Sequence, residues 1–223
     1  MRLQPTTELE STLAAFATLA ANAGGNPADA ELQQKHSGTK YEIELAVRMQ
    51  KSLSGLFCYH NFEGRYRDSR FEIDFMLLTS AGKALLIEVK GYSGFYDLCP
   101  TDSYLLDKID RGAQVHQVKN PLPQLARAKK FLTRIIDAVG IPITFESIVV
   151  FADDKFWPSK PLLNSFYGQK EAMVTTRNGF LEYVETLTVS PFFSDNPLSP
   201  LVDFLFYQQK KSPIFFDPFF FRQ

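Results

Sequence analysis

Two short stretches, FEIDF at residues 71–75 and IEVK at residues 87–90, decide how this sequence of 223 residues is interpreted. Both are typical of β-strands, because branched and aromatic residues surround each acid. A carboxylate inside an apolar strand costs free energy unless it is paired with a cation or binds a metal. Asp74, Glu88 and Lys90 are therefore the most informative side chains in the chain.

The loop between the two stretches sets their register. Strands over 70–79 and 83–90 leave a three-residue loop, and its last residue, Gly82, suits the left-handed backbone that such loops need. This register places Asp74 opposite Glu88, with Cβ atoms roughly 5 Å apart. Lys90 lies two residues beyond Glu88 and shares its face. A four-residue loop would instead separate the two acids.

The remaining pattern predicts a mixed α/β core in the order helix, three strands, helix, strand (αβββαβ). The second core helix is expected to begin at Asn120-Pro121 and to end at Gly140. The other expected elements are a helix over 39–54, strands over 56–62, 103–106, 147–152 and 172–176, and a helix over 177–187.

The ends of the chain differ in composition from the core. An alanine-rich helix is expected over 8–23, within an N-terminal extension at 1–36. The core domain is expected over 37–188, and a Phe- and Pro-rich C-terminal extension over 189–223. Because this C-terminal extension is so apolar, it is expected to pack on the core, or to form a homodimer contact or a partner-docking site.

Charge and cysteine content limit the class of protein. The formal net charge is −1, so nucleic-acid binding would have to come from local basic patches. Cys58 and Cys99 are too few to hold a chain of this length together. No apolar run reaches the ~20 residues of a membrane helix. We therefore expect a cytoplasmic protein with reduced thiols and no membrane partner.

Four motifs, taken in order, resemble the NERD (nuclease-related) domain of the PD-(D/E)xK nuclease-like superfamily. They are Gly38-x-x-x-Glu42, Glu72-Ile73-Asp74, Ile87-Glu88-Val89-Lys90 and Asn120-Pro121-x-x-Gln124. The similarity covers residues 37–154, about half of the chain. It implies a restriction-endonuclease-like fold. The family often has glycine where this chain has Tyr41, so a narrower site is expected here.

The resemblance also implies a role for each matching residue. Asp74 and Glu88 would be the metal-binding acids, and Lys90 the active-site lysine. Glu42 would match the acid of the first core helix, and Gln124 the polar residue that opens the second. Carboxylate ligands suit Mg²⁺ or Mn²⁺, and such a cation supports phosphodiester hydrolysis.

Structural roles could explain the same residues. Glu42 completes a capping box with Thr39, and Gln124 could cap its own helix. Asp74 and Lys90 could form a structural ion pair. The three histidines lack metal-ligand spacing and are expected to be ordinary surface or core residues; they are His36, His60 and His116.

Basic and aromatic residues could contact a nucleic-acid backbone or its bases. The alternative for those on the second core helix is an ordinary solvated face. The candidates are Arg65, Arg67, Arg70, Tyr92, Lys119, Arg127 and Lys130.

The sequence therefore favours a Mg²⁺- or Mn²⁺-dependent nuclease that acts on DNA or RNA. A catalytically weak nucleic-acid-binding or protein-interaction module on the same fold is the alternative. A third hypothesis places the function in the Phe-rich C-terminal segment, with the core domain as its scaffold.

Overall fold

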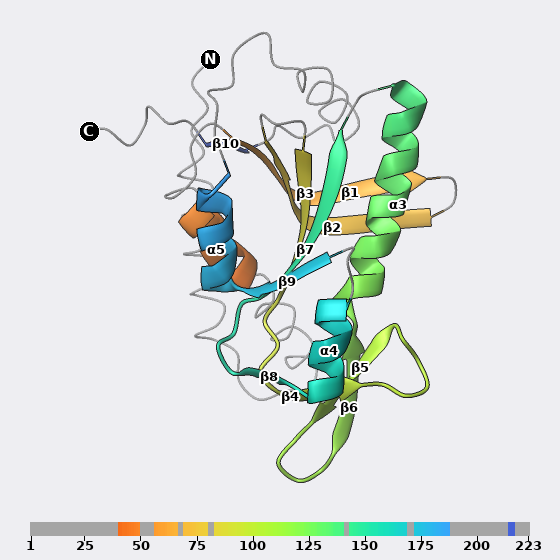
Figure 1. Ribbon diagram of the computed structural model, residues 1–223, viewed down its shortest axis with the longest axis vertical. Helices are drawn as coiled ribbons and strands as arrows, with labels where there is room; N and C mark the ends of the chain where they lie inside the picture. The colour runs from red at the N-terminus through yellow and green to blue at the C-terminus, as the bar shows by residue number, and fades with distance from the viewer. Residues whose placement is uncertain are drawn as a thin grey trace, which may run out of the picture.

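The computed structural model describes residues 40–49, 56–66, 69–79, 83–140, 143–168, 172–187 and 214–216, as two mixed β-sheets and four helices (Figure 1). The helices are one over residues 40–49, α3 (Pro121–Val139), α4 (Lys160–Gly168) and α5 (Arg177–Glu185). This mixed α/β architecture confirms the predicted fold class and is consistent with a restriction-endonuclease-like core.

The larger sheet has six strands in the order β10-β1-β2-β3-β7-β9. They are β1 (Leu56–Tyr66), β2 (Ser69–Leu78), β3 (Lys83–Lys90), β7 (Thr144–Phe151), β9 (Ala172–Thr176) and β10 (Ile214–Phe216). Neighbours from β10 to β3 pair antiparallel, whereas β7 lies parallel to β3 and β9 parallel to β7. Helix 40–49 precedes β1, and α3 lies between β3 and β7, which confirms the αβββαβ order.

The β2–β3 hairpin has the register that a three-residue loop dictates. Phe75 pairs with Ile87 and Leu78 pairs with Ala84. At the loop, the Thr79 N–H donates to the Lys83 carbonyl at 2.9 Å. One further step along this register places Asp74 across from Glu88, as expected from the sequence.

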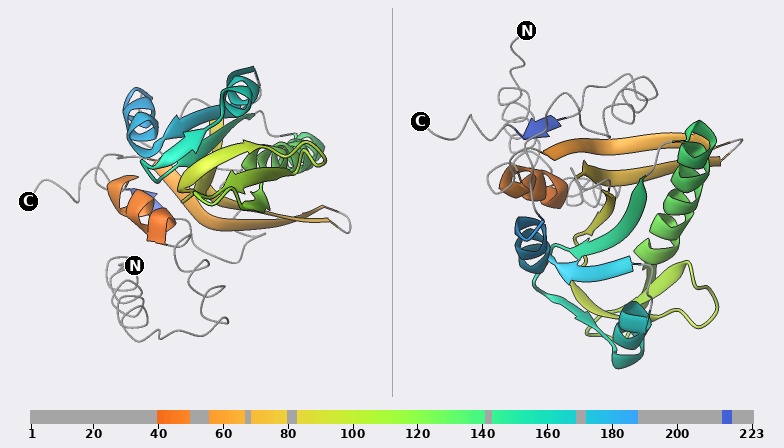
Figure 2. Two further views of the ribbon diagram at one scale, coloured as in Figure 1. Left: turned by 90° about the horizontal axis from the view of Figure 1, so that it is seen from below. Right: turned by 45° about the horizontal axis from the view of Figure 1, so that its top comes forward.

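Hydrophobic clusters cover both faces of the larger sheet, and Figure 2 shows helices on both sides of it. On one face, side chains of α3 and α4 pack on Met76, Leu86 and Val149. We call this the α3 face. On the opposite face, helix 40–49 and α5 pack on Leu77 and Ile87. With apolar residues on both of its sides, β3 is buried from Ala84 to Val89, and Glu88 is the one charged residue in that run.

The second core helix begins and ends where the sequence predicts. Asn120 is its N-cap and accepts a hydrogen bond from the Leu122 N–H at 3.1 Å. Pro121 occupies the first helical position, and Gly140 ends the helix with a left-handed φ of 70°. The buried side of α3 is formed by Leu122, Leu125, Ala128, Leu132 and Ile136.

The smaller sheet was largely missed by the sequence prediction, which placed a single strand near 103–106. Its order is β6-β5-β4-β8, with β4 (Gly94–Leu98), β5 (Leu105–Ile109), β6 (Val115–Lys119) and β8 (Phe156–Pro158). Tyr96 and Leu106 attach this sheet to the cluster on the α3 face. Strands of three to five residues show too little alternation to be recognised from sequence. The prediction also missed α4.

Part of the C-terminal segment joins the larger sheet. β10 pairs antiparallel with β1, with Ile214 opposite Cys58 and Phe216 opposite Leu56. The predicted helix over 8–23 and the rest of the segment after 189 lie outside the described residues. The domain boundaries at 36 and 188 stay predictions. Among the residues described, no helix is long and apolar enough to cross a bilayer.

At the end of the sheet away from Lys90, a polar network ties α5 to the strands. Lys83 Nζ lies 2.6 Å from Glu146 Oε1, and the Tyr183 hydroxyl donates to Glu146 Oε2 at 2.8 Å. The hydrogen bond from Lys83, helped by Tyr183, outweighs burial and holds the pKa of Glu146 below its ordinary value of 4.5.

This network predicts a pH-dependent contribution to stability. Because the folded pKa of Glu146 is lowered, its ionised form stabilises the fold above pH 4.5, and that contribution is lost as the pH falls through the folded pKa. Glu146→Gln should lower the unfolding free energy by about 0.5–1 kcal/mol at pH 7, the range for a partly exposed ion pair. Urea denaturation at a series of pH values measures this difference.

The exposed Glu182 on α5 supplies a matched control, since Glu182→Gln should change stability little at any pH. A deficit in Glu146→Gln that stays constant into the acid range would contradict the assigned role of its charge.

Candidate metal-dependent nuclease site

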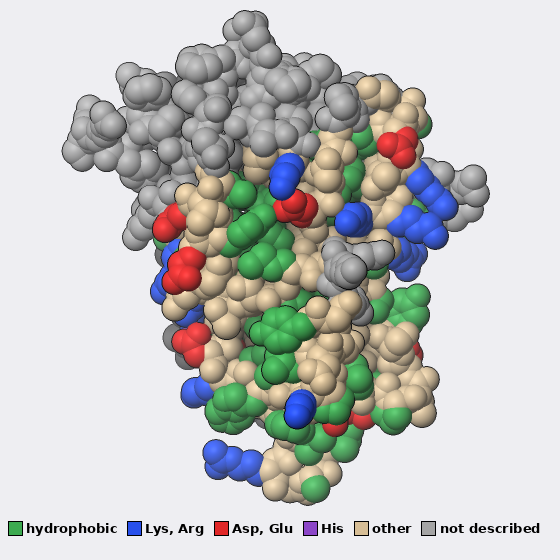
Figure 3. All heavy atoms as spheres, viewed as in Figure 1, with side chains coloured by type: hydrophobic (Ala, Val, Ile, Leu, Met, Phe, Trp, Pro, Cys, Tyr) green, Lys and Arg blue, Asp and Glu red, His purple; other side chains and the backbone are tan. Residues whose placement is uncertain are grey.

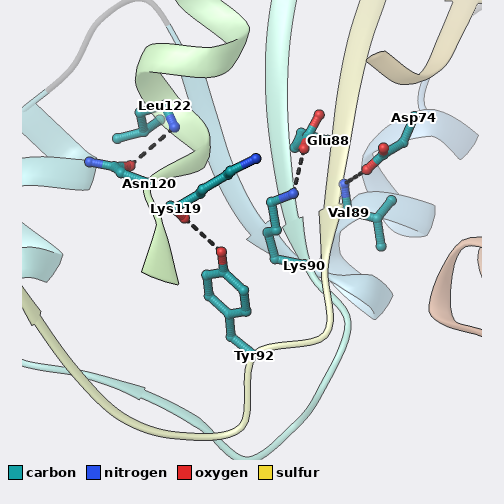
Figure 4. A network of polar contacts seen from close by, with 8 residues as sticks. All are labelled: Asp74, Glu88, Val89, Lys90, Tyr92, Lys119, Asn120 and Leu122. Atoms are coloured by element: carbon teal, nitrogen blue, oxygen red, sulfur yellow. Dashed lines mark hydrogen bonds and ion pairs between the residues drawn. The ribbon is translucent and has the colours of Figure 1, made fainter. Parts of the chain in front are cut away.

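Asp74 and Glu88 lie where β2 and β3 separate (Figure 4). The last pair of the ladder is Phe75 with Ile87. Beyond it the Asp74 carboxylate takes the place of a backbone acceptor, because its Oδ2 accepts the Val89 N–H at 2.7 Å. Asp74 and Glu88 thus lie one step beyond the last pair and form no backbone pair of their own.

Glu88 and Lys90 are joined on the same strand. Lys90 Nζ lies 2.5 Å from Glu88 Oε1, and the two side chains point the same way from β3 (Figure 4). The Glu88 side chain is 1% exposed and that of Lys90 is 19% exposed. The ammonium group therefore partly neutralises the buried acid while keeping some access to solvent.

Burial and like charge disfavour the ionised form of both acids. Burial raises the pKa of Asp74 well above its usual range, and the negative charges of Glu88 and Glu42 raise it further. Burial also raises the pKa of Glu88, although Lys90 partly opposes this effect. For Lys90, burial lowers the pKa, but attraction to Glu88 and Asp74 outweighs burial and raises it overall. Lys90 thus stays protonated at neutral pH and is unsuited to act as a general base.

A divalent cation fits this donor set. Glu88 Oε2 is buried and has no hydrogen-bond partner in the described part of the structure. An unpaired buried oxygen of this kind is costly, and a cation would satisfy it. Carboxylate oxygens are the ligands that Mg²⁺ and Mn²⁺ prefer, with water filling other positions. The described residues contain no cluster of three or more His, Cys, Asp or Glu arranged for metal binding. The acids that a cation could use here are the pair Asp74 and Glu88.

The structure brings Glu42 and Gln124 to the same pair. Glu42 is close enough for its charge to raise the pKa of both acids. Gln124, in the first turn of α3, acts on Glu88 as a hydrogen-bond donor that lowers its pKa. Asn120 already caps α3, so the alternative role of Gln124 as the helix cap is wrong.

The contacts that Tyr41 makes could not be predicted from the sequence. Its hydroxyl donates to Asp153 Oδ2 at 2.8 Å, and burial together with this bond raises its pKa to about 12. Its ring packs so closely on the backbone after Lys90 that a Cβ at Gly91 would collide with it. Tyr41 thus anchors the first helix to the end of β3, beside Lys90. The glycine directly after Lys90 was the one sequence signal for such a close approach.

His60 was also missed, since nothing in its spacing distinguishes it. Its Nε2 lies 3.4 Å from Glu42 Oε2. Glu44 pairs with Arg177 at 3.0 Å and with Lys40 at 3.9 Å, while Arg48 contacts Asn178.

The predicted nucleic-acid-binding residues have different surroundings. Lys119, Arg127 and Lys130 are exposed, and basic side chains gather along α3 (Figure 3). Arg70 is exposed on β2. The side chain of Arg65 and the whole of Arg67 lie outside the described residues.

Tyr92 differs from the free base-stacking side chain that the sequence suggested. Its ring stacks on Tyr96 with centroids 5.2 Å apart, and its hydroxyl donates to the Lys119 carbonyl at 2.6 Å. Tyr92 therefore braces the segment after Lys90 against the end of β6, with one ring face already covered.

The raised pKa of Asp74 predicts that this carboxylate destabilises the cation-free protein. A raised folded pKa means that ionisation is harder in the folded state, so the charge opposes folding at pH values above it. Asp74→Asn keeps an oxygen that can accept the Val89 N–H and removes the charge. It should raise the melting temperature in EDTA by about 2–4 °C, the effect of 1 kcal/mol in a domain of this size. A melting temperature below that of the wild type would refute the expected cost. Glu72→Gln, which changes an exposed acid on the same strand, is the control.

Comparison with known families agrees with this geometry. Residues 37–152, about half of the chain, match the model of the nuclease-related domain, NERD. The match spans the first core helix, the β1–β3 strands, α3 and β7, so it includes every residue gathered around Asp74 and Glu88. No curated protein and no solved structure matches the chain. On the strength of the family match, the chain belongs to the NERD (nuclease-related domain) family.

Proposed function

We propose that this protein is a Mg²⁺- or Mn²⁺-dependent nuclease that hydrolyses phosphodiester bonds of DNA. The observation that carries the proposal is the meeting of the buried Glu88, the partly buried Asp74 and a protonated lysine where the β2–β3 ladder ends. The Glu88 Oε2 atom supports it as well, because it is buried without a hydrogen-bond partner in the described part of the structure and a cation would satisfy it. Membership of a nuclease-related family agrees with this reaction class.

Asp74 and Glu88 would hold the cation between the separated strands. When bound, the cation neutralises phosphate oxygens and lowers the pKa of the attacking water. Val89 fixes the Asp74 carboxylate through its N–H, which leaves Oδ1 to face the site. Glu42 adds negative charge to the same region and would strengthen the attraction for a cation.

Lys90 would act through its charge, since it stays protonated. A fixed ammonium beside the scissile phosphate stabilises the negative charge that develops in the transition state. Cation binding at Glu88 would compete with the Lys90 contact and free the ammonium to approach the phosphate. Gln124 lies near the N-terminus of α3, where an amide and unpaired backbone N–H groups favour an anion.

The α3 helix would also carry the substrate-binding surface. Arg127 lies about one turn and Lys130 nearly two turns beyond Gln124, the residue that lowers the pKa of Glu88, and both are exposed. Arg127 is further held by the Phe131 ring, whose centre lies 5.5 Å from its guanidinium carbon. Such a surface would track a phosphate backbone that leads to the site.

A binding module without turnover remains the competing function. The short contact between Lys90 and Glu88 favours it, because an ammonium in this place can substitute for a metal ion. This module would bind DNA equally well with and without a divalent cation, whereas a nuclease would not.

The proposed function predicts cleavage that depends on both acids. The wild type should cut DNA with Mg²⁺ or Mn²⁺ and become inactive in EDTA. Asp74→Asn and Glu88→Gln should each lower the cleavage rate at least about 10²-fold, because each removes a ligand of the cation. Gel assays on single- and double-stranded DNA, with RNA in parallel, measure the rate and the substrate class.

Glu72→Gln is the matched control, since Glu72 is an exposed acid two residues before Asp74 on the same strand. Cleavage by both acid variants at the rate of this control would refute the ligand assignment. An inactive wild type that still binds DNA in EDTA would instead support the binding module.

The basic surface on α3 predicts a salt-dependent affinity. Arg127→Gln with Lys130→Gln should weaken DNA binding and lower the slope of log affinity against log salt by about 1 for each phosphate that the variant no longer neutralises. Fluorescence anisotropy at several salt concentrations measures the slope. Lys160→Gln on α4, also exposed, should leave it unchanged. An unaltered slope in the α3 variant would place the substrate elsewhere.

A further inference from the structure

His60 on β1 is held in one orientation by its neighbours. Its ring stacks on that of Phe75, with centroids 4.7 Å apart and an interplanar angle of 20°. Phe75 is fully buried and directly follows Asp74 on β2. His60 and Phe75 are also direct partners in the β1–β2 ladder. The imidazole is therefore fixed relative to the strand that carries Asp74.

The pairing of β1 with β2 is interrupted immediately after His60. The next residue, Asn61, has a left-handed φ of 51°, and the β1–β2 pairs pass from His60–Phe75 to Phe62–Ile73. Asn61 and Asp74, which lie between these pairs, are the positions left out. The irregularity places His60 at the last regular position before the site.

The free edge of the His60 ring faces the first helix. Nε2 lies 3.4 Å from Glu42 Oε2, a weak hydrogen bond slightly longer than the usual range. Both side chains are mostly shielded from solvent, with 21% of His60 and 17% of Glu42 exposed. Because a carboxylate can only accept, this contact requires the hydrogen to be on Nε2.

The position of the Glu42 carboxylate near two other acids is electrostatically unfavourable. Its charge raises the pKa of both Asp74 and Glu88, so all three acids repel one another. A glutamate on a helix surface can relieve such repulsion by turning its flexible side chain towards water. In the described structure, His60 is the side chain that contacts Glu42 and opposes this movement.

We infer that His60 is a positioning residue that holds the Glu42 carboxylate towards Asp74 and Glu88, so that the three acids act together on a divalent cation. The inference rests on the proposed metal-dependent function and adds a residue to it. His60 does not touch the cation or the substrate. It acts through Glu42. Because its ring is held on β1 and β2, it determines where the Glu42 side chain of the first helix lies.

Two substitutions separate the hydrogen bond from the packing of the ring. His60→Phe keeps an aromatic ring that can stack on Phe75 and removes the donor. His60→Gln removes the ring and keeps an amide that can reach the position of Nε2. Calorimetric titration with Mn²⁺, in the absence of DNA, measures the cation affinity of each variant.

His60→Phe should weaken Mn²⁺ binding about 10-fold, in line with the removal of a group that orients residues at a metal site. His60→Gln should restore affinity to within about threefold of the wild type. Glu42→Gln should weaken binding by a similar factor, and the double variant should be no weaker than Glu42→Gln alone, because both changes remove one interaction.

Wild-type affinity in His60→Phe would overturn the inference, as would a double variant whose weakening is the product of the two single effects. Failure of His60→Gln to restore affinity would overturn it too, by showing that the ring packing, and not the hydrogen bond, matters. If His60→Phe does not fold, as judged by its melting curve, His60→Leu also removes the donor. A wild-type protein that neither binds Mn²⁺ nor cleaves DNA would refute the proposed function itself.

Discussion

The burial of two carboxylates beside a single ammonium group is the constraint on which the site depends. Glu88 is buried and Asp74 partly buried in strands whose other side chains form the hydrophobic core. Lys90 balances only part of their charge. With Glu42 included, the four ionised groups carry a formal charge of −2, which a divalent cation would cancel. Since burial raises the pKa of Asp74 and of Glu88, the site would hold this charge in full only with a cation bound.

Three elements converge on this point because of how the sheet is built. The antiparallel β2–β3 hairpin sets Asp74 against Glu88, and the parallel pairing of β3 with β7 buries β3 on both edges. The crossover from β3 to β7 contains α3, whose first turn brings Gln124 to Glu88. On the other side, the Tyr41 ring presses the first helix against Gly91, and this contact places Glu42 near the strands. The sheet topology therefore determines the positions of Asp74 and Glu88, while side-chain packing places Glu42 beside them.

Local rules were enough to predict the hairpin and the second core helix. A three-residue loop and strict alternation determine the partner of each residue, and Asn120, Pro121 and Gly140 are independent signals at the ends of α3. The smaller sheet could not be predicted in this way, since its stability comes from Tyr96 and Leu106 packing on a core formed elsewhere in the chain. The same holds for the contacts of His60 with Glu42 and of Tyr41 with Asp153. These partners are 18 and 112 residues apart, and no periodic pattern links them.

The pairing of β10 with β1 has a consequence for biosynthesis. The ribosome makes β1 early and β10 only after every other described strand, so the outer edge of β1 has no partner during most of translation. An open strand edge can recruit foreign strands and promote aggregation. The outer edge of β1, next to the strand that carries Asp74, therefore lacks its described partner until residues 214–216 have emerged.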